Sequence, residues 1–369
     1  MVDLFSQYLK IKEKVDYSIQ EIINKSEFIK GSKVKDFEQN LSKYLGVGNV
    51  ITCGNGTDAL QIALMSLNLK PGDEIITTPF TFIATAEVIS LLGLKTVLVD
   101  VESDTFLINA NKIESAITKK TKAIIPVHLF GQIAEMDKII EIAKQNKIFI
   151  IEDAAQSLGG TFDLNNIQLH SGCIGDIGCT SFFPSKNLGC FGDGGAIFTN
   201  NNEIAEKIKM ISNHGMKTRY YHDIIGVNSR LDTIQAAVLD IKLQYLNEYI
   251  RSRKEVAQKY NSDLNGIRQI STPSIKRDHV FHQYTLFIND NSRDALKEYL
   301  ESNSIPSMIY YPVPLHLQKA FLNLGYKKGD FPISENLCDH VLSLPMHTEL
   351  NESQLDYITQ TIREFYDKR

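Results

Sequence analysis

The chain has 369 residues, of which 43% are hydrophobic, and its 39 basic and 44 acidic side chains give a formal net charge of −5. A single hydrophobic core stops growing at roughly 250–300 residues, so this length predicts a large domain with a smaller one beside it. A general nucleic-acid binder would carry a basic balance, and the acidic one therefore indicates a small-molecule partner and no nucleic acid.

The cysteines and the N-terminal segment exclude further classes. The 5 cysteines form no Cys-x-x-Cys pair, so we expect free thiols and no metal site. Residues 1–20 mix charged and apolar side chains and lack the apolar stretch of a signal peptide. No run approaches the roughly 20 apolar residues of a membrane-spanning helix. We expect a cytoplasmic protein that does not enter a membrane.

Short apolar runs alternate with helical patterns over the first two-thirds of the chain. The runs indicate strands at 74–78, 95–100, 122–127 and 148–153. Between them, apolar residues recur at helical spacing over 58–69, 83–93 and 136–146. Because continuous apolar strands belong to sheets buried on both faces, this rhythm predicts an α/β fold with a mostly parallel sheet covered by helices.

The pattern changes after Leu231. We expect one long helical stretch over 231–264, then a strand at 283–290 and a helix at 292–303. These elements predict a smaller α+β domain at the C-terminal end. We place the boundary so that residues 1–245 form the large domain, with an N-terminal helical segment, and residues 246–369 form the small one.

A glycine-rich loop follows the first short apolar run. Residues 53–60 read CGNGTDAL, in which two glycines precede a helical pattern. Ligands of open α/β sheets bind beyond the carboxyl ends of strands, and the N–H groups of a helix start, with the Thr57 hydroxyl, suit an anion. An ordinary helix start with Thr57 or Asp58 as the N-cap explains the same residues equally well.

A second loop begins at Asp153, which closes the apolar strand IFIIED. An unpaired carboxylate at the end of a buried strand is costly or becomes neutral, so Asp153 needs a cationic partner. The alternative is that Asp153 caps a helix over the residues that follow it.

The third loop carries Lys186 within TSFFPSKNLGCFGDGG, residues 180–195, where apolar residues and glycines surround it. Desolvation lowers the pKa of a lysine toward neutrality, and a neutral amine can attack a carbonyl carbon to form a Schiff base. A lysine considered alone more commonly extends to solvent or forms an ion pair, here with Asp193.

The three loops together fit one cofactor. Pyridoxal 5'-phosphate (PLP) needs an anion cradle for its phosphate, a carboxylate beside its pyridine nitrogen and a lysine for its aldehyde. The chain offers these groups in that order. We therefore predict that it binds PLP.

The motifs also resemble those of a known family. Taken in order, GNGTDAL, TPFTFIATAE, EDAAQSLGG, TSFFPSKNLGCFGDGG and GVNSRLDTIQAA resemble the DegT/StrS family of nucleotide-sugar aminotransferases. The resemblance runs from about Gly31 to residues 310–318, nearly the whole chain. It implies a fold-type-I PLP-dependent transferase with a smaller α+β C-terminal domain.

The resemblance assigns the cofactor-binding residues. It implies that Lys186 binds the aldehyde and later moves the proton, that Asp153 pairs with the pyridinium nitrogen and that Gln156 contacts the 3-oxygen. Phe82 would stack on the ring, although periodicity alone would place it in the core. The phosphate would be held by Gly56, Thr57 and Ser181, and by Asn228 of a neighbouring subunit in a homodimer with shared sites.

The same resemblance implies the reaction. Family members that act as dehydratases have histidine in place of the lysine, so Lys186 indicates transamination from L-glutamate to a keto-sugar. The motifs look closest to enzymes that aminate C3 of a UDP-linked 2-acetamido-3-keto-hexose or its uronic acid for surface glycans such as lipopolysaccharide O-antigen. Arg230 would meet a sugar carboxylate or pyrophosphate, or cap the following helix against Asp232.

The C-terminal motif YYPVPLHLQ departs from the family pattern. Relatives that act on the 3-keto-uronic acid often have histidine where this chain has Tyr310, which weakens the uronic-acid reading. Tyr310, Tyr311 and His316 are candidate sugar-binding residues, and a hydrogen-bonded structural role is the alternative for His316. A dTDP-3-keto-6-deoxyhexose 3-aminotransferase and a UDP-4-keto-sugar 4-aminotransferase remain alternatives.

Two other functional classes share part of this pattern. A PLP-binding regulator without turnover shares the cofactor residues, because family names have been attached to regulators. A nicotinamide enzyme is disfavoured, since the turn at residues 53–57 lacks Gly-x-Gly-x-x-Gly and no acidic residue follows it at the spacing usual for that motif.

Overall fold

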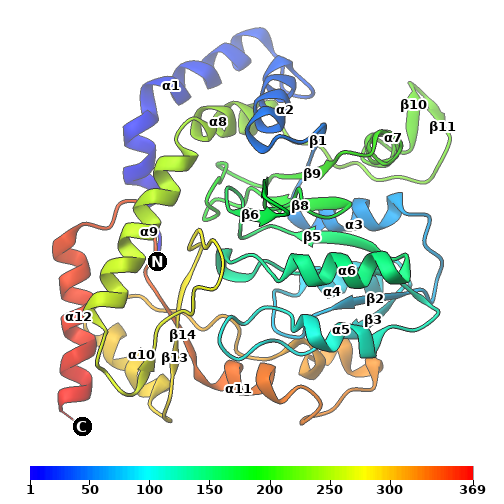
Figure 1. Ribbon diagram of the computed structural model, residues 1–369. Helices are drawn as coiled ribbons and strands as arrows, with labels where there is room; N and C mark the ends of the chain where they lie inside the picture. The colour runs from blue at the N-terminus through cyan, green and yellow to red at the C-terminus, as the bar shows by residue number, and fades with distance from the viewer. Residues whose placement is uncertain (369) are drawn as a thin grey trace.

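The computed structural model describes residues 1–368 and centres on a seven-stranded sheet in the order β1-β9-β8-β5-β4-β2-β3 (Figure 1). The strands are β1 (Asn49–Cys53), β2 (Glu74–Thr77), β3 (Lys95–Leu98), β4 (Thr121–Ile124), β5 (Phe149–Asp153), β8 (Ile177–Ser181) and β9 (Gly195–Thr199). The pairs β2–β3, β2–β4, β4–β5 and β5–β8 are parallel, and only β9 runs against its neighbours. The predicted mostly parallel sheet is confirmed, with strands at each of the four predicted places.

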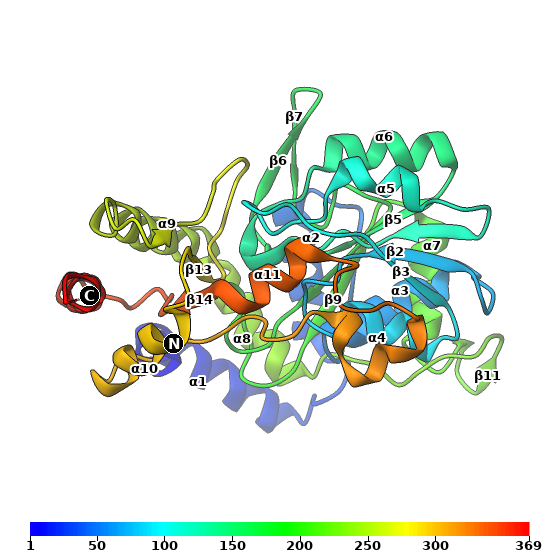
Figure 2. The same ribbon diagram turned by 90° about the horizontal axis from the view of Figure 1, so that it is seen from below.

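Helices cover both faces of this sheet. One face carries α3 (Gly56–Ser66), α4 (Ala84–Leu91) and α7 (Asn202–Ile211), and the other carries α5 (Ala110–Ala116) and α6 (Met136–Asn146). Successive side chains of a strand point to opposite faces of the sheet. In β2, Ile75 packs with α3 and α4, whereas the next residue, Ile76, packs with α5 and α6. Figure 2 shows α5 and α6 on the opposite side of the sheet from α3 and α4.

The predicted single helix over 231–264 is wrong, because the structure divides it. Helix α8 (Thr233–Leu243) packs on α2 (Ser32–Leu45), whereas α9 (Leu246–Asp263) leads to the C-terminal part of the chain. Tyr245 between them has φ −106° and ψ 0°, outside the helical region. Leu246 and Ile250 at the start of α9 share a hydrophobic cluster with Leu239 of α8, whereas Val256 farther along α9 belongs to the C-terminal cluster. The chain therefore changes direction at a place where no glycine or proline marks it.

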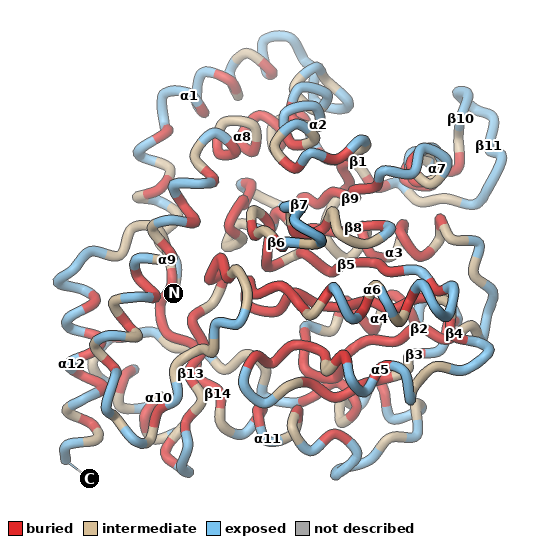
Figure 3. The backbone as a smooth tube through the Cα atoms, in the orientation of Figure 1, coloured by how far each residue is buried: buried red, intermediate tan, exposed pale blue. Residues whose placement is uncertain are grey.

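The C-terminal part is built on a second, antiparallel sheet. Its strands are β12 (Ile270–Ser271), β13 (Tyr284–Ile288) and β14 (Val341–Leu344), and α9, α10 (Arg293–Ser302) and α12 (Glu352–Asp367) pack beside them. The predicted strand at 283–290 and helix at 292–303 are confirmed. Figure 3 shows buried residues concentrated in the central strands, with exposed ones along the outer helices. The division between residues 245 and 246 stays a prediction.

The remaining elements lie at the periphery. Helix α1 (Leu4–Lys25) packs on α8 through Ile11 and Val15. The others are the hairpins β6 (Thr161–Leu164) with β7 (Ile167–His170) and β10 (Met216–Thr218) with β11 (Tyr221–His222), and helix α11 (Pro332–His340). Within residues 1–368, no helix combines the length and apolar character needed to cross a bilayer.

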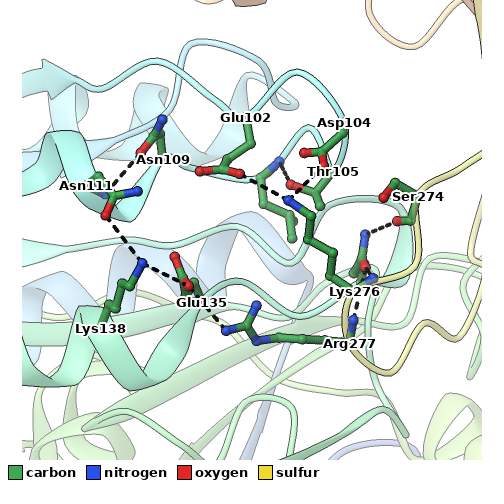
Figure 4. A network of polar contacts seen from close by, with 12 residues as sticks. Glu102, Asp104, Thr105, Asn109, Asn111, Glu135, Lys138, Ser274, Lys276 and Arg277 are labelled. Carbon is green, nitrogen blue, oxygen red and sulfur yellow. Dashed lines mark hydrogen bonds and ion pairs between the residues drawn. The ribbon is translucent and has the colours of Figure 1, made fainter.

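An ion-pair network joins the C-terminal part to the large sheet (Figure 4). Lys276 Nζ lies 2.7 Å from Asp104 and 3.5 Å from Glu102, and Arg277 lies 3.1 Å from Asp137. The side chain of Gln132 accepts a hydrogen bond from the Lys276 N–H at 2.9 Å. These contacts hold the segment before β13 against the loops that follow β3 and β4.

Candidate active site

The carboxyl ends of the parallel strands bring the predicted loops to one edge of the sheet. In the register of the sheet, Gly195 at the start of β9 lies between Cys53 at the end of β1 and Ser181 at the end of β8. Asp153 at the end of β5 pairs in register with Cys179 of β8. The glycine turn, Asp153 and the Lys186 loop therefore open to the same side, where ligands of this sheet type bind.

The loop of Lys186 folds tightly. The Lys186 N–H donates to Phe183 O at 2.8 Å, and a Cβ at Gly189 would lie 2.3 Å from Pro184 O, so only glycine fits there. The Lys186 side chain is partly buried. Burial lowers the pKa of the Lys186 amine to about 8, and the charge of Asp153 opposes this shift. A pKa near 8 leaves about a quarter of such amines neutral at pH 7.5, against about 0.1% at the ordinary value.

Asp153 is buried and held by hydrogen bonds. Its Oδ2 accepts from the hydroxyl of Thr85 at 2.8 Å and its Oδ1 accepts from the Ala155 N–H at 3.2 Å. The alternative of a helix N-cap is wrong, because the residues after it form a turn and no helix. Its cationic neighbour is Lys186, whose amine feels the Asp153 charge. The ion pair of Lys186 with Asp193 does not occur among residues 1–368.

Gln156 and two aromatic rings lie beside this carboxylate. Gln156 Oε1 accepts from the Phe130 N–H at 2.6 Å, which turns its Nε2 toward the Tyr311 hydroxyl at 3.2 Å. The Tyr311 ring centroid lies 6.3 Å from that of Phe82. Periodicity placed Phe82 in the core, and this is wrong, because the residue is 55% exposed. An exposed ring at this edge is free to stack on a ligand.

The glycine turn forms a capped helix start. Asn55 is the N-cap of α3, since its side chain accepts from the Asp58 N–H at 2.8 Å, so the alternative of Thr57 or Asp58 as the cap is wrong. A Cβ at Gly56 would lie 2.7 Å from Ser181 Cβ, which explains the glycine. The N–H groups of Gly56 and Thr57 occupy the first two helical positions, where no partner exists within a helix.

The segment after the β10–β11 hairpin returns to this turn. Asn228 is exposed, and the neighbouring Ser229 is buried against the glycine turn. The positive charge of Arg230 acts on Lys30, whose pKa is lowered mainly by burial. Among residues 1–368, Arg230 forms no ion pair with Asp232, so the capping alternative is not observed.

The C-terminal candidates are spread more widely. Tyr310 is half-buried with its ring 5.9 Å from that of Tyr311. His316 is fully buried, and its Nε2 lies 3.0 Å from Glu335. This contact favours the structural alternative for His316. Direct sugar contacts of Tyr310, Tyr311 and His316 stay predictions.

Comparison with known proteins identifies the family. Residues 9–363 match the DegT/DnrJ/EryC1/StrS aminotransferase family. The chain belongs to this family. Aminotransfer is the activity for which the family is described.

Similar proteins cover the chain almost completely. It is 44% identical to a pleiotropic regulatory protein of Geobacillus stearothermophilus, with 99% of this chain and 98% of the relative covered. It is 43% identical to the UDP-2-acetamido-2-deoxy-3-oxo-D-glucuronate aminotransferase of Pseudomonas aeruginosa, with 97% of each covered. It is 41% identical to the UDP-N-acetyl-3-dehydro-alpha-D-glucosamine 3-aminotransferase of Acidithiobacillus ferrooxidans, with 98% and 96% covered.

Solved structures agree with the fold-type expectation. A DegT/DnrJ/EryC1/StrS aminotransferase from Brucella abortus has a TM-score of 0.94 at 42% identity, with 99% of this chain and 98% of that chain covered. The PLP form of a sugar aminotransferase, Spr1654 of Streptococcus pneumoniae, has a TM-score of 0.90 at 26% identity, with 96% of each covered.

The structure adds residues that the sequence did not single out. Glu152 accepts hydrogen bonds from three backbone N–H groups and lies 2.8 Å from His128 Nε2, and both side chains are fully buried. His128 Nδ1 accepts from the Ala134 N–H, so its proton is on Nε2. This pair fixes the strand end that carries Asp153. Thr85 also donates to Asp153. A polar threonine on the apolar face of the predicted helix at 83–93 could have indicated from the sequence that it has a buried partner.

The lowered pKa of Lys186 makes a prediction about stability. Replacing Lys186 by methionine keeps the apolar stem and is expected to raise the stability of the cofactor-free protein at pH 7 by on the order of 3 kcal/mol. The native pKa near 8 is below the unfolded value, so the cost of the buried amine is full below pH 8. This cost in stability falls as the pH rises from about 8 to about 10.5, because the amine then becomes neutral in the unfolded chain as well. Urea unfolding at pH 7 and at pH 10.5 measures both limits, with the exposed Lys144→Met variant as control. An equal gain in the free energy of unfolding at both pH values would contradict a lowered pKa of Lys186.

Proposed function

We propose that the protein is a PLP-dependent aminotransferase that moves an amino group from L-glutamate to the C3 keto group of a UDP-linked 2-acetamido-3-keto-sugar. The observation that carries this proposal is the placement of Lys186 beside the buried Asp153, at the strand edge that also carries the glycine turn. An amine with a pKa of about 8 is neutral often enough to attack a carbonyl carbon and to accept a proton near neutral pH.

Each group fits one part of the cofactor. When bound, PLP supplies an electron sink for the carbon that loses a proton. Asp153, which accepts a hydrogen bond from the Thr85 hydroxyl, would pair with the pyridine nitrogen and favour its protonated form. The N–H groups of Gly56 and Thr57 and the Ser181 hydroxyl would bind the phosphate. The Gln156 amide would contact the 3-oxygen, and the exposed Phe82 ring would cover one face of the ring system.

Lys186 would also act as the proton carrier. Its Nζ makes no hydrogen bond or ion pair with residues 1–368, so no protein group would hold this amine back from accepting and donating a proton. The same amine can serve the half-reaction with glutamate and the half-reaction with the keto-sugar, because each needs a proton moved by a base at this one site.

The substrate assignment is supported by relatives that act on UDP-linked 3-oxo sugars. Tyr310 in place of a histidine disfavours the uronic acid and favours 3-keto-N-acetylglucosamine, with Arg230 available for the pyrophosphate. The dTDP-3-keto-6-deoxyhexose and UDP-4-keto-sugar alternatives differ only in acceptor. A regulator without turnover is a second candidate, favoured by the name of the Geobacillus relative.

We further propose a homodimer with shared sites, acting in the cytoplasm on a nucleotide sugar for surface glycans such as lipopolysaccharide O-antigen. Large apolar side chains are exposed on α1 and around the β10–β11 hairpin, among them Phe5, Leu9, Tyr17, Tyr220, Tyr221 and Ile225. Exposed apolar side chains gathered on particular elements indicate association. A dimer would cover them, and the exposed Asn228 would then reach the phosphate of the partner's cofactor.

An acceptor screen tests the substrate. With PLP and glutamate, kcat/KM is expected to be at least about tenfold higher for UDP-2-acetamido-3-keto-glucose than for its uronic acid, a UDP-4-keto-sugar or a dTDP-3-keto-6-deoxyhexose, because the pocket must match the polar groups of one sugar. Product is followed by mass spectrometry. Preference for another acceptor would replace the sugar and keep the reaction, whereas no turnover with any acceptor would favour the regulator.

A further inference from the structure

Ser229 joins two parts of the site that are far apart in sequence. Its hydroxyl donates to Asp58 Oδ2 at 2.6 Å and accepts from the Gly54 N–H at 2.8 Å. Ser229 is 2% exposed, and its own N–H donates to Ser212 O at 3.1 Å. The hydroxyl is therefore fixed between the glycine turn and the Asp58 carboxylate.

Asp58 occupies a position that would otherwise compete with an anionic ligand. It is the third residue of α3, counted after the N-cap Asn55. An acidic side chain at this position commonly reaches back to the free N–H groups of the helix start, to which the helix dipole attracts it. In this chain its Oδ2 turns away to Ser229, and the N–H groups of Gly56 and Thr57 stay available.

We propose that Ser229 is a positioning residue that keeps the Asp58 carboxylate out of the cofactor's phosphate site. The inference rests on the proposed PLP function. Without the Ser229 hydroxyl, Asp58 has no other side-chain donor among residues 1–368, and it turns toward the first turn of α3. There it occupies the donors that the phosphate needs and places a like charge beside it.

The test is PLP binding to the cofactor-free protein, measured by equilibrium dialysis. Ser229→Ala is expected to raise the Kd for PLP about tenfold. The phosphate would lose about one charged hydrogen bond to the helix start and would be repelled by the Asp58 carboxylate. In the double variant Ser229→Ala with Asp58→Ala, affinity is expected to return to that of Asp58→Ala alone. A merely structural role of Ser229 would give no such recovery. Ser212→Ala, whose hydroxyl bonds to Lys209 O in the same segment, is the matched control.

Each outcome decides the proposal. A Kd for Ser229→Ala within about twofold of wild type, or a double variant as weak as Ser229→Ala, overturns it. Should Ser229→Ala fail to fold, Asp58→Ala in the wild-type background replaces it: unchanged or tighter PLP binding supports the proposal, and binding weakened more than about threefold overturns it. Wild-type protein that does not bind PLP contradicts the proposed function itself, and so the two failures are distinguishable.

Discussion

Replacement of Lys186 by alanine is expected to lower kcat for amino transfer by about four orders of magnitude. The reason is that burial lowers the pKa of the Lys186 amine to about 8 while the charge of Asp153 acts on it, so the variant loses the amine that would form the Schiff base and carry the proton. The measurement is glutamate-dependent formation of the amino sugar, with variants loaded at saturating PLP.

Controls separate the amine from the fold. The exposed Lys144→Ala variant is expected to keep full activity. Addition of a small primary amine such as ethylamine should restore part of the lost rate in Lys186→Ala, because the vacated side chain leaves room near the same atoms. Activity of Lys186→Ala within about tenfold of wild type would remove Lys186 from the mechanism.

Replacement of Asp153 by asparagine is the second large effect, an expected loss of about a hundredfold to a thousandfold in kcat. The amide keeps the shape and its oxygen can still accept from Thr85, and the change gives up only the 3.2 Å hydrogen bond from the Ala155 N–H. The negative charge that would keep the pyridine nitrogen protonated is lost. Steady-state kinetics and the absorption spectrum of the PLP-loaded variant measure this change.

Thr85→Val provides the graded comparison. It preserves volume and removes only the hydroxyl that donates to Asp153, so a loss of about tenfold is expected. If Asp153→Asn loses no more activity than Thr85→Val, the charge of Asp153 is not what the reaction requires.

The central fold was readable from sequence because its strands are buried on both faces. Runs such as residues 148–153 are apolar without alternation, and the helices between them show one apolar face. The break at Tyr245 was not readable, since no glycine or proline separates α8 from α9 and the later part of α9 alone packs in the C-terminal core. The helix start at Asn55 was misplaced because Asn, Thr and Asp all suit an N-cap, and backbone geometry decides among them.

Some residues of the candidate site were also readable from the sequence, and others were not. Lys186 and Asp153 stood out because each is a charged group in an apolar context, which sequence displays directly. The contact of Ser229 with Asp58 spans 171 residues, and that of Gln156 with Tyr311 spans 155. Such pairs depend on how the loops meet in space, and no local pattern indicates them. Phe82 was misplaced by its periodicity, which is that of a core residue, whereas the structure exposes it; its stacking on the cofactor stays a prediction.

The most direct measurement is the site of covalent attachment of PLP. Wild-type protein is incubated with PLP, reduced with borohydride, digested and sequenced by mass spectrometry, with and without prior addition of L-glutamate. The account predicts a single modified peptide that contains Lys186, and loss of that modification when glutamate has first converted the cofactor to its amino form. Labelling spread over exposed lysines, or labelling of Lys186 that glutamate does not reduce, would contradict it.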